Sequence, residues 1–295
     1  MLSPAKINLG LKILFKRPDG FHELQSIFLK LDFGDEISFE KIEEGRFELE
    51  TENNLKGKAF EDFQKVSNFG NYKDNLLYKT FSKVQTIKKT NGVRIKLIKN
   101  IPTGGGLGGG SSNSASLLKY LFPEEIPPTK KVIELASSLG ADVPFFLFKG
   151  HKLVGGIGDK FEDIEISKGF GILVSTGYVI NTGEAFSNLK KPLQKDPTSE
   201  TWKCLQDEVH SALRNGDWNI LSGKLSNDFE EFALNTYPDL RKLKHRMVEF
   251  GLPYVSMTGS GSSFYGLSSS KTERDNLLLK LRKEFREFQF TSFCF

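Results

Sequence analysis

The stretch of sequence that decides the fold spans residues 101–112 and reads Ile-Pro-Thr-Gly-Gly-Gly-Leu-Gly-Gly-Gly-Ser-Ser. It follows Val93–Ile98, whose alternating apolar residues are typical of a strand. The residues after it predict a helix, which Ser111 or Ser112 can cap and whose apolar positions share one face: Ala115, Leu118, Leu121 and Phe122. A strand, a glycine-rich turn and a helix start together present backbone N–H groups and the positive end of a helix dipole. The stretch therefore predicts a phosphate site.

Glycine fills six of the seven positions from 104 to 110. Glycine adopts positive φ angles and lets a phosphate approach the backbone closely. The alternative is a merely flexible loop, but so many glycines cost conformational entropy on folding that such a loop does not require. Gly104, Gly106 and Gly109 also satisfy the dinucleotide-binding pattern G-x-G-x-x-G. Against that interpretation, the loop follows about 100 residues of chain, and no strand ending in Asp or Glu occurs in the next ~20 residues. A P-loop is excluded because no lysine follows Gly110.

The composition of the 295 residues predicts an ordinary globular protein of two domains, 1–150 and 151–295. The 41 basic and 37 acidic residues leave a formal charge of +4 without a long run of one sign, which argues against a nucleic-acid partner. No apolar run approaches the ~18 residues of a membrane helix, and the N-terminus lacks the apolar stretch of an export signal. Cys204 and Cys294 lie far apart without a zinc or disulfide pattern. These observations predict a cytoplasmic protein.

Further elements follow from hydrophobic periodicity. Two strands are expected early in the chain, at Lys6–Phe15 and Asp35–Glu40, with a turn at Arg17–Gly20 between them. The polar segment Gly45–Tyr72 is expected to be a loop or an irregular insertion. After it we expect a helix at Asn75–Val84, a helix at 132–139 that Gly140 ends, a hairpin at Lys152–Ile166, a buried strand at Phe170–Ser175, and a strand, turn and strand at Tyr254–Leu267 within an otherwise helical remainder.

Three segments resemble, in order, the three motifs of the GHMP kinases, the family of galactokinase, homoserine kinase and mevalonate kinase. They are Ser3–Leu9, Pro102–Ser112 and Met257–Ser262. The resemblance implies an α+β fold of two domains, a ribosomal protein S5 domain 2-like N-terminal domain that binds ATP and a ferredoxin-like C-terminal domain, with the active site between them. It also implies transfer of the γ-phosphoryl group of ATP to a hydroxyl group of a small molecule.

Within the family, Pro4–Leu9 and Arg17–Leu24 are most similar to the members that phosphorylate the 2-hydroxyl of a cytidine diphosphate derivative of 2-C-methyl-D-erythritol, in the non-mevalonate route to isoprenoids. Two alternatives stay open. The first is a family member that acts on another alcohol, such as homoserine or mevalonate, against which Asp19–Leu24 argues. The second is a nucleotide-binding sensor without chemistry, against which the retention of Lys6 and Asp142 argues.

The resemblance also assigns roles to individual residues. Asp142 is the implied base that accepts the hydroxyl proton, although an Asp just after Gly140 also suits the cap of a short helix. Lys6 is the implied partner that keeps Asp142 ionised and offsets charge on the phosphoryl group. Magnesium is expected with ATP; no acidic ligand is identified, and a serine hydroxyl after the glycines is one candidate. The implied ATP-binding residues are Asn75, Pro102, Gly104, Gly105, Gly106, Leu107, Gly108, Gly109, Gly110, Ser111 and Ser112.

The implied substrate carries a cytosine, which requires aromatic stacking and a hydrogen-bonding partner for its edge. His22 is expected to bind that edge while Phe21 and Phe186 stack on the two faces of the base; core packing is the alternative for each phenylalanine. Phe21 stands where the family usually has tyrosine, which keeps the ring and removes a hydroxyl. The remaining implied substrate contacts are Asn8, near the reacting hydroxyl, and Gly259 and Ser260, in a second anion-accepting turn. We expect a monomer or a weak homodimer.

Overall fold

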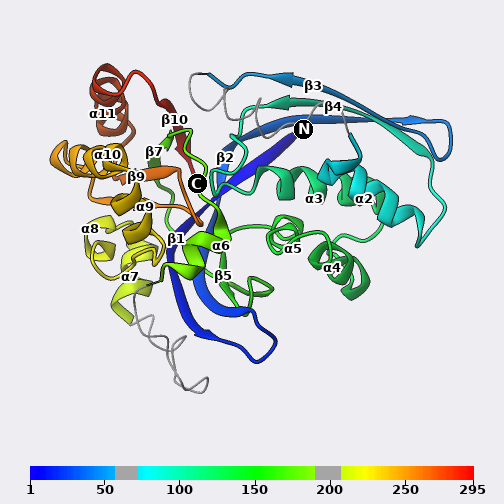
Figure 1. The fold of residues 1–295 in the computed structure, drawn as a ribbon, viewed down its shortest axis with the longest axis horizontal. Helices are drawn as coiled ribbons and strands as arrows, with labels where there is room; N and C mark the ends of the chain where they lie inside the picture. Colours follow the sequence, from blue (N-terminus) through cyan, green and yellow to red (C-terminus); the bar gives the residue numbers. More distant parts are fainter. Residues whose placement is uncertain (57–71, 190–206) are drawn as a thin grey trace.

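The computed structural model describes residues 1–56, 72–189 and 207–295. Within these ranges the chain forms two β-sheets with helices packed on them (Figure 1). The strands are β1 Leu2–Lys16, β2 His22–Ile42, β3 Phe47–Asn53, β4 Gly92–Lys99, β5 Lys152–Gly155, β6 Lys160–Asp163, β7 Phe170–Ser175, β8 Tyr254–Met257, β9 Phe264–Ser268 and β10 Gln289–Cys294. The helices are α2 Leu76–Gln85, α3 Gly109–Leu121, α4 Lys130–Ser137, α5 Val143–Leu147, α6 Thr182–Ser187, α7 Asp207–Asn215, α8 Trp218–Leu221, α9 Glu230–Thr236, α10 Pro238–Glu249 and α11 Lys271–Glu284, with a 3₁₀ turn at Tyr72–Asp74.

The long strand β2 organises the first sheet. The order of this six-stranded sheet is β3-β4-β2-β5-β6, and β1 pairs with β2 in addition. The first half of β2 pairs with β5, whereas its second half, Glu36–Ile42, pairs with β4. β1 leads into the turn that the sequence predicts at Arg17–Gly20, and β2 returns from that turn antiparallel to β1 over most of its length. As a result, the N-terminal strand reaches the middle of the molecule.

Helices α2 to α5 cover one face of the first sheet. They bury a common core with sheet residues such as Ile37 and Ile95. The four positions expected on one face of α3, namely Ala115, Leu118, Leu121 and Phe122, are all buried. Burial of this apolar stripe orients α3 so that its N-terminus points back toward β1. Each helix in the described ranges is too short or too polar to cross a lipid bilayer.

The second sheet is antiparallel and has the order β10-β7-β9-β8. Its strands include the predicted buried strand at Phe170–Ser175 and the two predicted strands within Tyr254–Leu267. One face of the sheet packs on α9, α10 and α11, where residues such as Leu240, Leu243 and Leu281 are buried. A four-stranded sheet with helices on one face agrees with the ferredoxin-like C-terminal domain that the resemblance implies.

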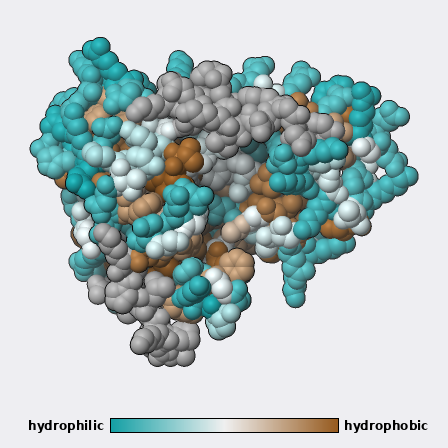
Figure 2. Space-filling model, viewed as in Figure 1, coloured by the Kyte–Doolittle hydropathy of each residue, from teal (hydrophilic) through white to brown (hydrophobic). Residues whose placement is uncertain are grey.

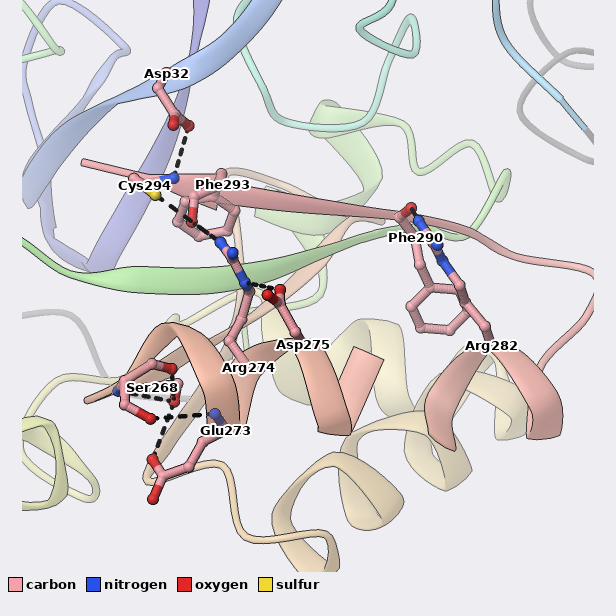
Figure 3. Close-up of polar contacts among 10 residues, drawn as sticks. Asp32, Ser268, Glu273, Arg274, Asp275, Arg282, Phe290, Phe293 and Cys294 are labelled. Carbon is pink, nitrogen blue, oxygen red and sulfur yellow. Dashed lines mark hydrogen bonds and ion pairs between the residues drawn. The ribbon is translucent and has the colours of Figure 1, made fainter. Parts of the chain in front are cut away.

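Helix α11 holds the last strand through arginine side chains (Figure 3). The Arg274 guanidinium is buried and donates to the Phe293 carbonyl at 3.0 Å, and Arg282 donates to the Phe290 carbonyl at 2.8 Å. On the other side of β10, the Cys294 N–H donates to the carboxylate of Asp32, which lies on β2, at 2.6 Å. The edge strand is therefore fastened both to its own helix and to the first sheet.

The two sheets share a core of their own. Ile7 and Leu29 of the first sheet and Leu267 and Phe293 of the second belong to one buried cluster. Figure 2 shows hydrophobic side chains gathered in the middle of the molecule, between the second sheet and the helices of the first, with hydrophilic side chains over most of the periphery. This contact brings β1 next to β8 and β9. The predicted functional residues Lys6 and Asn8 lie on β1, and Gly259 and Ser260 lie in the turn between β8 and β9.

The structure corrects three expectations about secondary structure. Within Gly45–Tyr72, residues 47–53 form β3 instead of a loop, and residues 57–71 lie outside the described part of the chain. β3 is parallel to β4, so the pair needs a crossover, which α2 supplies. Helix α4 ends at Ser137, earlier than expected, and Gly140 does not adopt the positive φ of a C-terminal cap. The residue before α3 is Gly108, so Ser111 and Ser112 lie inside the helix and do not cap it.

The boundary at residue 150 stays a prediction. The hairpin of β5 and β6 follows that residue, and β5 pairs with β2 in the first sheet. Cys204 lies outside the described residues.

Candidate active site

A cavity of about 690 Å³ lies where the first sheet meets the second half of the chain. Its wall contains residues 102–111 without interruption, which include the glycine loop, defined here as residues 103–110. Asn75 lines the cavity as well, so every predicted ATP-binding residue except Ser112 belongs to its wall. Its other side is formed by Ile180, Thr182 and Ser260, from the second half of the chain. The size and the mixed apolar and polar lining suit a nucleotide.

The start of α3 leaves its backbone N–H groups without a side-chain cap. Gly108 occupies the N-cap position in the left-handed region with φ 70°, and no side chain accepts a hydrogen bond there. The Ser111 side of the first turn faces the cavity, whereas Ser112 is buried and its hydroxyl accepts a hydrogen bond from Ser3 at 2.8 Å. Uncapped N–H groups at the positive end of a helix dipole are a strong anion site. This geometry supports the predicted phosphate site and places Ser112 behind it.

Gly106 offers a direct test of the loop. Its φ is 77°, and a Cβ at this position would lie 2.2 Å from the carbonyl oxygen of Thr258. We expect Gly106→Ala to cost about 1–3 kcal/mol of stability, because it adds backbone strain and a clash, and to weaken ATP binding because the loop must move. Urea unfolding and calorimetric titration with ATP measure the two effects. Gly110→Ala is the control for stability, since no heavy atom lies within 4 Å of its added Cβ; equal stability of both variants would contradict the prediction.

Lys6 and Asp142 form an ion pair beside the glycine loop. Lys6 Nζ lies 3.4 Å from Asp142 Oδ2, and the side chains are 4% and 30% exposed respectively. The Lys6 N–H donates to the Leu107 carbonyl at 3.0 Å, so this part of β1 is attached to the loop. The Asp142 carboxylate makes no capping hydrogen bond to α5, the helix that begins after it. Its orientation therefore favours the predicted chemical role over the capping role.

Asn8 connects Lys6 to the second half of the chain. Its side-chain oxygen accepts a hydrogen bond from Lys6 Nζ at 2.6 Å. Its backbone N–H donates to Thr258 Oγ1 at 3.0 Å, and the same hydroxyl lies 3.2 Å from the Gly106 carbonyl oxygen. The Tyr265 hydroxyl donates to the Asn8 carbonyl at 2.7 Å. Thr258 thus links β1, the glycine loop and the β8–β9 turn, and sequence reasoning did not assign it a role although it lies within the third motif.

The β8–β9 turn packs directly on the glycine loop. A Cβ at Gly259 would lie 3.0 Å from the Gly106 Cα. Ser260 lines the cavity and its hydroxyl lies 3.0 Å from that of Thr182. The buried Asn227 donates through Nδ2 to the carbonyl oxygens of Met257 and Gly259, at 2.8 Å each. Thr182 and Asn227 were not identified from the sequence, because each is an isolated polar residue whose position in space depends on the second sheet.

The predicted cytosine-binding residues come together only in part. The rings of His22 and Phe186 stack at 4.5 Å between centroids, and Phe186 packs edge-on against Phe229 at 4.8 Å. Phe21 is 58% exposed at the β1–β2 turn. Burial and the nearby Lys16 cation lower the pKa of His22, which favours the neutral imidazole. One face of the Phe186 ring is in contact with the His22 ring in this structure.

Asn75 has a structural role in addition to its place in the cavity wall. Its side-chain oxygen accepts a hydrogen bond from the Leu77 N–H at 2.9 Å and caps α2. The neighbouring Leu76 and Leu77, together with Leu97 of β4, give this end of the cavity an apolar wall. An apolar slot next to a phosphate loop suits the base of a nucleotide.

Family comparisons agree with this geometry. The model of the GHMP kinases N terminal domain matches residues 75–150, and the model of the GHMP kinases C terminal region matches residues 209–287. A 4-diphosphocytidyl-2-C-methyl-D-erythritol kinase of Leptospira interrogans is 46% identical over 297 residues, which cover 100% of both chains. The protein with the same description from Leptospira biflexa is 39% identical, over 100% of this chain and 98% of its own.

Solved structures show the same architecture. The crystal structure of a 4-(cytidine 5'-diphospho)-2C-methyl-D-erythritol kinase superimposes with a TM-score of 0.77 at 27% identity, covering 100% of this chain and 98% of that one. A homoserine kinase from Cytophaga hutchinsonii shares the fold with a TM-score of 0.68 at 15% identity, over 99% and 93% of the two chains. The expected two-domain α+β fold is therefore confirmed.

A glycine loop at a helix start, flanked by a buried lysine and a partly exposed aspartate, defines in this fold a phosphotransferase of the small-molecule kinase class. The chain belongs to the GHMP kinase family. ATP is accordingly its phosphoryl donor.

Proposed function

We propose that the protein transfers the γ-phosphoryl group of ATP to the 2-hydroxyl of 4-diphosphocytidyl-2-C-methyl-D-erythritol, giving the 2-phosphate and ADP, in the non-mevalonate route to isoprenoid precursors. Similarity to proteins of that description over the full chain supports the substrate. The Lys6–Asp142 ion pair, next to the uncapped start of α3, is the observation that supports the chemistry.

In this proposal the chain holds the donor and prepares the acceptor. The N–H groups of the glycine loop and of the first turn of α3 bind the phosphates of ATP. Asp142 accepts the proton of the substrate hydroxyl as that oxygen attacks the γ-phosphorus. Lys6 lies between the loop and Asp142, where its charge stabilises both the carboxylate and the negative charge that develops on the transferring group. Asn8 holds the Lys6 ammonium in place.

Magnesium is part of the proposal as a companion of ATP. The described residues contain no group of three or more His, Cys, Asp or Glu that could hold a metal ion. Mg²⁺ commonly retains water and binds through substrate phosphates and one or two carboxylates. Ser111 on the cavity wall fits that limited protein contribution. When bound, the ion supplies positive charge at the phosphates.

The cytidine part of the substrate is assigned to the region of His22 and Phe186. The stacked pair offers an aromatic platform at the end of β2, and the neutral imidazole has one nitrogen that can accept a hydrogen bond from the amino group of cytosine. The exposed ring of Phe21 lies on the same turn and is free to cover the second face of the base.

Removal of one aromatic ring tests this assignment. Phe186→Ala is expected to raise KM for the cytidine substrate by about 5- to 150-fold, since stacking of a base on an aromatic ring contributes about 1–3 kcal/mol. The KM for ATP should stay unchanged, because Phe186 does not belong to the wall of the nucleotide cavity. Phe186→Tyr keeps the ring and serves as the matched control. A KM for the cytidine substrate that is the same in all three proteins would remove Phe186 from the binding site.

An ADP-release assay with three alcohols tests the function itself. We expect turnover with 4-diphosphocytidyl-2-C-methyl-D-erythritol and none with homoserine or mevalonate. Turnover with either of the latter would show that the protein is another kind of GHMP kinase. Binding of ATP without turnover of any of the three would favour a nucleotide sensor.

The proposal extends to the setting of the enzyme. A cytoplasmic location provides both ATP and a cytidine diphosphate derivative. We propose a monomer or a weak homodimer as the active form. Sedimentation velocity across the concentration range of the activity assay measures this state; a stable higher oligomer would contradict it.

A further inference from the structure

The short helix α5 carries Asp142 at its beginning and depends on other elements for its position. It has only five residues, and Asp142, its N-cap residue, makes no capping hydrogen bond. A helix of this length is unstable by itself in water, so tertiary contacts must hold it. Phe145 and Phe146 are buried, and a Cβ on Gly108 of the glycine loop would lie 2.9 Å from Phe146 Cζ. A shift of α5 would therefore move Asp142 relative to the loop.

Two lysine side chains hold the other end of α5. Lys119 of α3 donates through Nζ to the Phe146 carbonyl at 2.7 Å. Lys30 of β2 donates through Nζ to the carbonyl of Phe148, the residue that follows the helix. The last carbonyl groups of a helix have no partner within it and form the negative end of its dipole, so ammonium groups are favourable there. Lys30 and Lys119, called the lysine clamp below, thus attach the C-terminal end of α5 to β2 and α3.

Lys30 lies directly opposite Lys6 on the neighbouring strand. The two residues are partners in the pairing of β1 with β2, so their side chains leave the same face of the sheet. Lys6 Nζ lies 4.7 Å from the centroid of the Phe28 ring, and Lys30 Nζ lies 5.0 Å from that of Phe145. These two rings pack edge-on at 5.1 Å between centroids. One face of the sheet therefore holds both ends of α5, with Lys6 at Asp142 and Lys30 at the C-terminal end.

The alternative role for the lysine clamp is stabilisation of the fold. Burial and the nearby charges of Lys119 and Lys152 lower the pKa of Lys30 to about 7, and burial lowers the pKa of Lys119. A lysine whose pKa is lower in the folded than in the unfolded protein makes folding less favourable while it is charged, and stability rises with pH above the folded value. The charges of the clamp are therefore unfavourable for stability, and their common target is one short helix. This combination favours a role in positioning.

We propose that Lys30 and Lys119 are positioning residues for phosphoryl transfer, which hold the C-terminal end of α5 and so fix Asp142 relative to Lys6 and the glycine loop. This inference rests on the proposed function. It goes beyond that function because neither lysine lines the nucleotide cavity. The two lysines act on the chemical step through Asp142 and leave the binding of both substrates unchanged.

Substitution by methionine tests the lysine clamp, because methionine is similar in length and lacks the charge and the donors. We expect Lys30→Met and Lys119→Met each to lower the single-turnover rate about 5- to 100-fold, since a displacement of ~1 Å at a reacting group can cost about 10²-fold. KM for ATP and KM for the cytidine substrate should stay close to the wild-type values. Lys30→Arg keeps the charge and the donors, so it should recover most of the rate.

The matched control is Lys88→Met. Lys88 Nζ also donates to a carbonyl at the end of a helix, that of Leu121 in α3, at 2.6 Å, and it also lies over an aromatic ring, that of Phe122, at 3.9 Å from the centroid. It makes these contacts at the end of α3 that lies away from the glycine loop. This variant should keep the wild-type rate; a loss equal to that of the clamp variants would overturn the proposal, since any lysine at a helix end would then have the same effect.

A double-variant cycle shows whether the clamp acts through Asp142. In the Asp142→Asn protein no base is left to position, so the addition of Lys30→Met should lower the remaining single-turnover rate little. Losses that multiply in the double variant would overturn the proposal, because Lys30 would then act independently of Asp142. Lys119→Met in the same background repeats the test at the second residue of the clamp, so the proposal stays open to refutation if Lys30→Met does not fold.

Wild-type rates in the folded methionine variants would overturn the proposal, and so would a higher KM for ATP at an unchanged rate, since the clamp would then act on the glycine loop. A wild-type protein that does not phosphorylate the cytidine substrate would overturn the proposed function together with this inference. Turnover that depends on Asp142 and on neither lysine would overturn this inference alone.

Discussion

Asp142→Asn is expected to lower kcat by about 10²- to 10⁴-fold, the range that positioned general bases contribute, while the dissociation constant for ATP stays close to that of the wild-type protein. The asparagine keeps the size and shape of the side chain and loses the ability to accept a proton. Asp142 is partly exposed and does not cap α5, so its replacement removes no hydrogen bond from the backbone of that helix. Rapid-quench measurement of a single turnover isolates the chemical step from product release.

The matched control for Asp142 is Asp275→Asn. Asp275 also pairs with a mostly buried cation, Arg274, at 2.8 Å, with side chains 48% and 5% exposed, but it lies on α11 (Figure 3). This variant should keep wild-type kcat. A single-turnover rate for Asp142→Asn within a few-fold of the control would remove Asp142 from the proposed mechanism.

Lys6→Ala is expected to have an effect of similar size, lowering kcat by orders of magnitude with ATP binding largely intact. The substitution removes the charge that faces both Asp142 and the transferring phosphoryl group. It also leaves a space next to Asn8 and Phe28, so Lys6→Met, which fills that space without the charge, should be measured beside it. Lys152→Met is the control, since Lys152 is a buried lysine paired with Asp163 away from the cavity.

The double variant Lys6→Ala/Asp142→Asn shows whether the two residues act as a unit. If both residues serve the same chemical step, kcat of the double variant should be only slightly lower than kcat of the less active single variant. Losses that simply multiply would indicate that the residues act independently. Near-wild-type turnover in both lysine variants would exclude Lys6 from the chemistry.

The local features of the site could be predicted from sequence because they depend on neighbouring residues. The glycine loop between a strand and a helix was expected, and the structure has Gly104, Gly106 and Gly108 at positive φ there. Helix α3 was expected from the spacing of its apolar residues, and the same residues are buried. The predicted N-cap of α3 was wrong. Ser111 and Ser112 have good capping side chains, but Gly108 readily adopts the left-handed conformation and occupies the N-cap position instead.

Features that depend on distant contacts could not be predicted in the same way. β3 alternates Phe47, Leu49 and Thr51 with glutamates, yet it becomes a strand only because β4 provides a parallel partner 46 positions later, as Phe47 pairs with Val93. The stacking of His22 on Phe186 joins two segments of unrelated local sequence. Thr182 and Asn227 carry no local signal of function, since an isolated polar residue is usually solvated.

By itself, the sequence determined the phosphate loop, the order of the three motifs and therefore the family, because a turn that needs glycine and a helix that needs an apolar stripe are properties of short segments. The tertiary structure alone decided which distant groups join the glycine loop at the site. Asn8 and Thr258 are 250 positions apart, and Asp35 and Asn113 are 78 apart, yet both pairs are hydrogen-bonded. Those contacts arise from the packing of the two sheets on a common core, where burial of apolar surface brings polar groups together that no local pattern connects.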